Sequence, residues 1–118
     1  MLKVLIADDS AFMRTIIKNY IKEFSEIQII EAEDGKDAIS KFSATIPDVV
    51  FLDMIMPGLS GLEVLKEIKK VNKKSRIIMV TSVGQSKVIE EALKNGAERY
   101  ITKPFKAEEI KKIIQQSL

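Results

Sequence analysis

Five short apolar segments recur along the chain, and each is followed by a longer segment with helical periodicity. The apolar segments are Leu2–Ala7, Ile27–Ala32, Asp48–Asp53, Arg76–Thr81 and Arg99–Thr102. Segments of this length and composition are typical of strands that are buried on both faces of a parallel sheet. Strict alternation of strand and helix therefore predicts an α/β fold, in which helices cover both faces of one parallel sheet.

The intervening segments carry signals that begin and end helices. Ser10 can cap the first helix, and Ser60 with Glu63 has the spacing of a capping box. Asp34-Gly35 is a turn signal, and Asn95-Gly96 is a helix stop. The apolar residues that form the expected inner faces of four of the helices are Met13, Ile16, Ile17, Tyr20, Ile21, Phe24, Ala38, Ile39, Phe42, Leu62, Leu65, Ile68, Ile110, Ile113 and Ile114. Another helix is expected to run through Val88, Ile89, Ala92 and Leu93.

The composition of the chain excludes several classes of site. With 118 residues we expect one domain, and the formal net charge of +2 gives no general attraction to nucleic acid or to a membrane surface. The chain contains neither Cys nor His, so disulfides, thiol catalysis and the usual zinc ligands are excluded. The sequence shows no signal peptide and no apolar run that could cross a bilayer, so we expect a cytoplasmic protein. We also expect a monomer.

Functional side chains stand where the predicted strands end. Asp8 and Asp9 follow the first strand, Asp53 ends the third, Thr81 ends the fourth, and Lys103 follows the fifth. Because the carboxyl ends of parallel strands share one edge of the sheet, we expect these side chains to lie together. Three close carboxylates need a counter-charge, which Mg²⁺ would supply because it prefers oxygen ligands. An Asp beside Mg²⁺ and Lys is suited to accept a phosphoryl group as a nucleophile.

Each of these residues also has a simpler interpretation. Asp8 or Asp9 could cap the first helix, and Asp53 could be an ordinary loop acid. Thr81 could be present because Thr favours strands, and Lys103 could be a solvated surface lysine. Their shared position at one edge of the sheet favours a functional site over four separate coincidences.

Four motifs resemble, in order and spacing, those of two-component receiver domains: "LIADDS", "VVFLDMIMPGLSG", "IIMVTS" and "YITKPF". The resemblance covers the whole chain, so we interpret residues 1–118 as one receiver (response regulatory) domain. Within that family, the segments "DDSAFMR" and "SVGQ" are most similar to stand-alone chemotaxis regulators of the CheY type. The resemblance implies a doubly wound, five-stranded parallel sheet of strand order 2-1-3-4-5 flanked by five helices, a flavodoxin-like or CheY-like fold.

The resemblance also implies separate roles for the acidic residues. Asp53 is the phosphoacceptor and binds Mg²⁺ together with Asp9 and the backbone carbonyl of Ile55. Asp8 acts mostly through a metal-bound water. These roles make Mg²⁺ the expected cofactor.

Further roles and partners follow from the same resemblance. Lys103 contacts the phosphoryl group, and the Lys103–Pro104 peptide bond is cis. After phosphorylation, Thr81 moves toward the phosphoryl group and Tyr100 turns inward. The implied partners are a histidine kinase of the CheA type, a downstream motor, switch or adaptor protein, and a phosphatase, with no direct binding to nucleic acid or membrane. The surface that would bind a downstream partner leans basic, which suggests an acidic partner; its residues are Val88, Lys94, Arg99, Tyr100, Lys103, Lys106, Lys111 and Lys112.

Two positions near the expected site carry apolar side chains. Ile55 follows Asp53 by two residues and Val83 follows Thr81 by two, and neither side chain can orient water by hydrogen bonding. We therefore expect slow loss of the phosphoryl group unless a phosphatase supplies the missing group. The rate of phosphoryl loss from the double variant Ile55→Asn, Val83→Glu would test this expectation.

The preferred function is a signalling switch rather than a metabolic enzyme, and three alternatives stay open. Within the same family, the chain could be a phosphorelay intermediate or the isolated receiver of a transcription regulator. A Mg²⁺-dependent phosphatase with an Asp nucleophile is disfavoured, because such enzymes usually carry a second acid where Ile55 stands. A flavodoxin-like binding module is disfavoured, because the acids of "ADDSAF" would repel a phosphate group unless a metal intervened.

Overall fold

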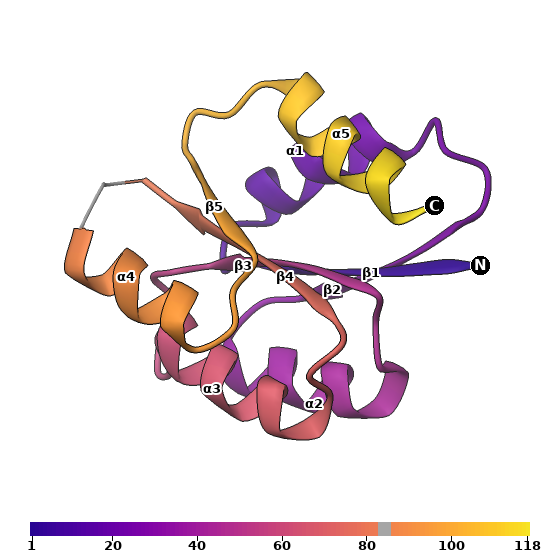
Figure 1. The fold of residues 1–118 in the computed structure, drawn as a ribbon. Helices are drawn as coiled ribbons and strands as arrows, with labels where there is room; N and C mark the ends of the chain where they lie inside the picture. Colours follow the sequence, from indigo (N-terminus) through magenta and orange to yellow (C-terminus); the bar gives the residue numbers. More distant parts are fainter. Residues whose placement is uncertain (83–85) are drawn as a thin grey trace.

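The computed structural model describes residues 1–82 and 86–118 and has the expected α/β architecture (Figure 1). Five parallel strands form one sheet in the order β2-β1-β3-β4-β5, which confirms the predicted order. The strands are β1 (Leu2–Ala7), β2 (Ile27–Ala32), β3 (Val49–Asp53), β4 (Arg76–Thr81) and β5 (Arg99–Thr102). The helices are α1 (Ala11–Ile21), α2 (Gly35–Thr45), α3 (Gly61–Val71), α4 (Ser86–Lys94) and α5 (Ala107–Ser117).

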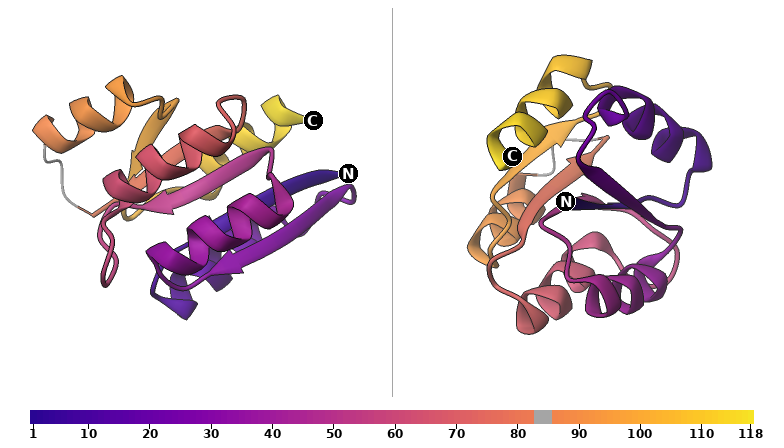
Figure 2. Two further views of the ribbon diagram at one scale, coloured as in Figure 1. Left: turned by 90° about the horizontal axis from the view of Figure 1, so that it is seen from below. Right: turned by 90° about the vertical axis from the view of Figure 1, so that its right-hand side faces the viewer.

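Helices cover both faces of the sheet (Figures 1 and 2). α1 and α5 lie on one face, and α2, α3 and α4 lie on the other. Because side chains alternate between the two faces of a strand, neighbouring residues of β1 enter different cores. Val4 and Ile6 pack with α1 and α5, whereas Leu5 and Ala7 pack with α2 and α3. Burial on both faces explains why β3 is buried at every position and has a continuous apolar run before its final acid.

The predicted helix caps are present. Ser10 caps α1 by accepting the N–H of Met13 at 3.2 Å, and Ser60 with Glu63 forms the predicted capping box of α3. Asp34, which the sequence suggested only as part of a turn, caps α2 through its side chain. Across the two described ranges, no helix combines the length and the apolar character needed to cross a membrane.

A few boundaries differ from the sequence prediction. The third strand begins at Val49, one residue later than expected, and α1 ends at Ile21. Phe24 still reaches the core, but from the turn after α1. The helix expected through Leu93 is present as α4, and Leu93 itself is 41% exposed. It lies one turn after Ile89, about 40° from it around the helix, at the edge of the buried stripe of α4.

Gly61 allows the loop between β3 and α3 to return against the end of β3. Its N–H donates to the carbonyl oxygen of Met54 at 2.8 Å. A Cβ atom at this position would lie 2.2 Å from the carbonyl oxygen of Asp53 and 2.7 Å from the Cα of Met54. Both neighbours are backbone atoms that cannot rotate away, so this close approach requires glycine.

The Gly61→Ala substitution should therefore destabilise the fold by about 1–3 kcal/mol, the usual cost of overpacking. Urea unfolding would measure the change, and Gly58→Ala is the matched control. Gly58 has a φ of +80°, and a Cβ atom added there would meet no atom within 4 Å, so its alanine variant introduces backbone strain without a clash. Unchanged stability of Gly61→Ala would contradict the close approach.

Candidate metal centre

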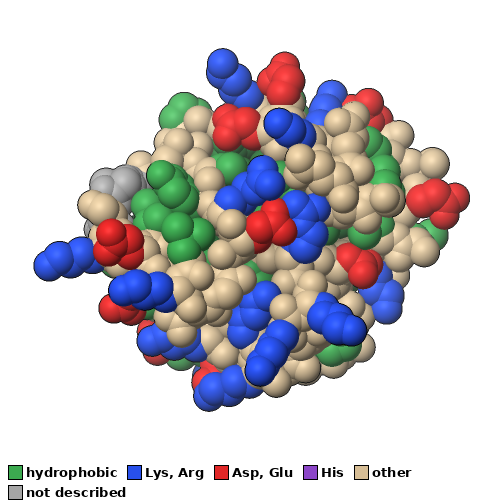
Figure 3. Space-filling view, viewed as in Figure 1, with side chains coloured by type: hydrophobic (Ala, Val, Ile, Leu, Met, Phe, Trp, Pro, Cys, Tyr) green, Lys and Arg blue, Asp and Glu red, His purple; other side chains and the backbone are tan. Residues whose placement is uncertain are grey.

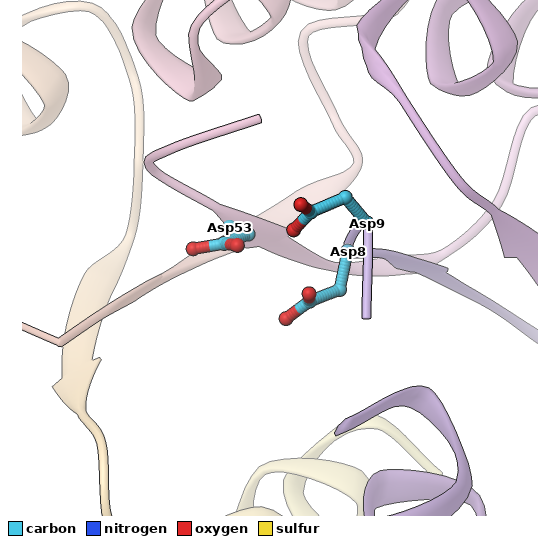
Figure 4. A group of neighbouring side chains, drawn as sticks. All are labelled: Asp8, Asp9 and Asp53. Carbon is cyan, nitrogen blue, oxygen red and sulfur yellow. The ribbon is translucent and has the colours of Figure 1, made fainter. Parts of the chain in front are cut away.

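Three carboxylates meet at the carboxyl edge of the sheet (Figure 4). Asp8 and Asp9 follow β1, and Asp53 is the last residue of the neighbouring strand β3. One carboxylate oxygen from each residue lies within 4.8 Å of the corresponding oxygens of the other two. Figure 4 shows Asp8 and Asp9 on one chain segment and Asp53 on another. The acidic cluster predicted from the strand ends is therefore present.

The two adjacent acids have different environments. Asp8 is buried; its Oδ1 accepts the backbone N–H of Ser10 at 2.9 Å, and its Oδ2 accepts from the Nζ of Lys103 at 3.1 Å. Asp9 is exposed. The side-chain cap of α1 comes from Ser10, so the simple capping interpretation of Asp8 and Asp9 is wrong.

Lys103 places a positive charge within the cluster. Its Nζ lies 3.1 Å from the Asp8 carboxylate and 3.5 Å from the Asp53 carboxylate, and 19% of its side chain is exposed. The Lys103–Pro104 peptide bond is cis, as predicted. Lys103 is thus a partner of two buried acids and not a solvated surface lysine.

The charge of the cluster is incompletely balanced at Asp53. This residue is 6% exposed, and its burial raises the pKa of its carboxyl group. The Asp8 carboxylate raises the same pKa further, while Lys103 and the N–H of Ile55, at 3.4 Å, act in the opposite direction. Because the net pKa is raised, a further cation would favour the ionised form of Asp53. The donor set of three carboxylates fits a hard divalent ion such as Mg²⁺.

Thr81 and Tyr100 lie on the two strands beyond β3. Thr81 ends β4, is buried, and lines a hollow of about 300 Å³ together with Ile55. Tyr100 lies on β5 and is 44% exposed. Val83, which the sequence paired with Ile55 as an apolar position, lies outside the described residues. The movements of Thr81 and Tyr100 and the metal-binding role of the Ile55 carbonyl stay predictions.

Arg14 is a neighbour of the cluster that the sequence analysis gave no role. Its Nη1 donates to the backbone carbonyl of Asp8 at 2.6 Å, and its Nε donates to the carboxylate of Glu31 at 3.0 Å. The sequence signal for Arg14 is weak, because a single arginine in the first turns of a helix is more often a surface residue.

Comparison with known proteins agrees with this geometry. The family described as response regulator receiver domain matches residues 4–115. The chain is 39% identical to the chemotaxis protein CheY of Listeria monocytogenes over 117 residues, which cover 99% of this chain and 98% of that protein. It is 42% identical over 106 residues to the protein-glutamate methylesterase/protein-glutamine glutaminase of Thermotoga maritima, covering 87% of this chain and 30% of that protein.

A solved structure of a receiver domain is also similar to this chain in fold and sequence. The crystal structure of the response regulator domain of Thermotoga maritima CheB is 37% identical in sequence and has a TM-score of 0.88, covering 99% of this chain and 96% of that one. The range that matches the family includes the acidic cluster and Lys103. The chain therefore belongs to the family of response regulator receiver domains.

Proposed function

We propose that the chain is a phosphorylation-activated signalling switch, in which Asp53 accepts a phosphoryl group from a phosphohistidine of a histidine kinase. The observation that carries this proposal is the buried Asp53 carboxylate with Asp8, Asp9 and Lys103 around it. Mg²⁺ would be held by Asp9, Asp53 and the Ile55 carbonyl, and by Asp8 through water. When bound, it would neutralise negative charge on the transferred phosphoryl group.

The transfer needs an ionised nucleophile and a nearby positive charge. A carboxylate oxygen of Asp53 attacks the phosphorus atom, the phosphorus–nitrogen bond of the donor breaks, and the leaving imidazole takes up a proton. The product is an acyl phosphate on Asp53. Lys103 lies 3.5 Å from the Asp53 carboxylate, within reach of the negative charge that develops on the phosphoryl oxygens. Protonation of Asp53 would prevent the attack, so positive charges at this edge also keep the nucleophile ionised.

Chemotaxis is the proposed setting, because the chain is 39% identical to a chemotaxis protein CheY over nearly its whole length. The similarity to part of a larger methylesterase supports a second candidate, a receiver that controls an attached or separate effector. An aspartyl phosphatase is the weaker alternative, because Ile55 stands where such enzymes usually have a second acid. In this proposal the chain catalyses only its own phosphorylation and dephosphorylation. A cytoplasmic location and a monomeric state also remain predictions.

The surface formed by α4, β5 and α5 is the proposed binding surface for a downstream partner. Figure 3 shows apolar side chains beside mixed charges on this side of the molecule, and Tyr100 is among the exposed apolar residues. Part of the basic charge is compensated, since Arg99 pairs with Glu98 at 3.3 Å and Lys111 pairs with Glu23 at 2.7 Å. The positive charge that an acidic partner would meet therefore comes mainly from the exposed lysines Lys94, Lys106 and Lys112.

Incubation with a small acyl phosphate and Mg²⁺ should add one phosphoryl group to the wild-type chain and none to Asp53→Ala, because Asp53 is the proposed nucleophile. Intact mass would measure the adduct. Glu33→Gln, which removes an exposed acid just after β2, is the matched control and should react like the wild type. A wild-type chain that acquires no adduct would refute the proposal.

Without a divalent cation, Asp53→Asn should be more stable than the wild type at pH 7. The raised pKa of Asp53 means that the folded chain binds this proton more tightly than the unfolded chain, so the Asp53 charge destabilises the fold once pH exceeds the folded pKa. We expect a gain of about 1 kcal/mol, or roughly 3–6 °C in melting temperature, which disappears below the unfolded pKa of about 3.9.

Thermal unfolding in chelator at several pH values would measure this difference. Addition of Mg²⁺ should then stabilise the wild type more than Asp53→Asn, because the variant lacks one of the proposed ligands. A metal-free wild type that is the more stable of the two at pH 7 would show that Lys103 already balances the cluster.

Tyrosine fluorescence can follow the proposed switch, because the chain has two Tyr and no Trp. In a Tyr20→Phe background, emission comes from Tyr100, which is 44% exposed. Phosphorylation should lower the acrylamide quenching of Tyr100 by about a factor of two, as the inward conformation becomes the major one. Thr81→Ala should remove most of this change, and Thr81→Ser should retain it because the hydroxyl group is kept. The same quenching with and without the phosphoryl group would contradict the Tyr100 switch.

A further inference from the structure

Arg14 connects three elements at the end of β1. It lies in the first turns of α1, and its side chain is 14% exposed. Its Nη1 donates to the carbonyl oxygen of Asp8 at 2.6 Å, and its Nε donates to Oε1 of Glu31 at 3.0 Å. Glu31 belongs to β2 and lies opposite Ile6 of β1 in the register. The planar guanidinium group therefore holds the end of β1 and the end of β2 at once.

The carbonyl contact has a direct effect on Asp9. The carbonyl group of Asp8 and the nitrogen of Asp9 share one rigid peptide plane, so fixing the oxygen fixes the direction in which Asp9 leaves the strand. The other side of Asp8 is held as well, because its N–H donates to the carbonyl of Ala32 at 3.1 Å. Asp9 itself is exposed, and its carboxylate lies within 4.8 Å of two others. Repulsion between like charges would turn it toward water if the peptide plane were free.

We infer that Arg14 is a positioning residue for the metal site, which acts by holding the Asp8–Asp9 peptide plane so that the Asp9 carboxylate stays beside Asp8 and Asp53. This inference rests on the proposed function, because it takes Mg²⁺ as the ligand of the cluster. The contribution of Arg14 is geometric, since its charge is paired with Glu31 and a cation near the site would by itself repel Mg²⁺.

The sign of the effect on metal binding separates geometry from charge. If Arg14 acted only as a nearby positive charge, Arg14→Met would bind Mg²⁺ more tightly than the wild type. As a positioning residue, its loss should instead weaken binding by about tenfold, the lower end of what partners of metal ligands usually contribute. Calorimetric titration of the unphosphorylated protein with Mg²⁺ measures this without any catalytic step.

Lys18→Met is the matched control. Lys18 lies on the same helix and donates to the same Glu31 carboxylate at 2.9 Å, so its variant removes an equal charge without touching the Asp8 carbonyl. Its Mg²⁺ affinity should stay within about twofold of the wild type, because a half-exposed charge is largely screened. In the metal-free protein, the backbone amide resonance of Asp9 should shift in Arg14→Met and keep its position in Lys18→Met.

Arg14→Lys tests the inference even where Arg14→Met does not fold. An ammonium group keeps the charge but lacks the planar fork that reaches Asp8 and Glu31 together, so we expect Mg²⁺ binding weakened by about threefold or more. Wild-type affinity in Arg14→Lys, or affinity equal to or tighter than wild type in Arg14→Met, would overturn the inference. Failure of the wild type to bind Mg²⁺ would instead count against the proposed function.

Discussion

The repulsion among three carboxylates at one edge of the sheet is the constraint on which the site depends. β1 and β3 are adjacent and parallel, with Ala7 opposite Leu52, so the acids that follow these two residues are brought together by the backbone ladder itself. Their backbones cannot separate without the loss of strand pairing at Ala7 and Leu52. Lys103, delivered by the end of β5, compensates for part of the charge, yet the pKa of Asp53 is still raised. The metal-free edge is therefore an electrostatically unfavourable part of the fold that is prepared for a cation.

The fold could be predicted from the sequence because its three central strands, β1, β3 and β4, are buried over most of their length. In such strands the apolar run marks the element, and the first polar residue after it marks the carboxyl edge. That rule predicted that Asp53 lies beside Asp8 and Asp9, and the three carboxylates are close together in the structure. The same reasoning placed Lys103 at this edge, since it follows the fifth strand, and in the structure it pairs with Asp8 and Asp53.

The parts that escaped prediction depend on orientations that sequence patterns do not encode. Arg14 was overlooked because its main acceptor is a backbone carbonyl, and every residue has one. Whether the guanidinium group reaches it depends on the angle between α1 and the sheet. Successive side chains of an extended segment point in opposite directions, so one of the neighbours Asp8 and Asp9 is buried and the other is exposed. The packing of β1 decides which of the two is buried.

That division gives the two acids unequal electrostatic positions. Asp8 shares Lys103 with Asp53, so any movement of Lys103 toward a phosphoryl group on Asp53 takes positive charge away from a buried carboxylate. Asp8 would then keep its hydrogen bond from the Ser10 N–H, but one backbone N–H does not balance the full negative charge of the Asp8 carboxylate. A divalent cation beside Asp8 removes this conflict, because it leaves Lys103 able to follow the phosphoryl charge. In the proposed function, the metal would therefore be needed as much for the buried Asp8 carboxylate that loses Lys103 as for the phosphoryl group on Asp53.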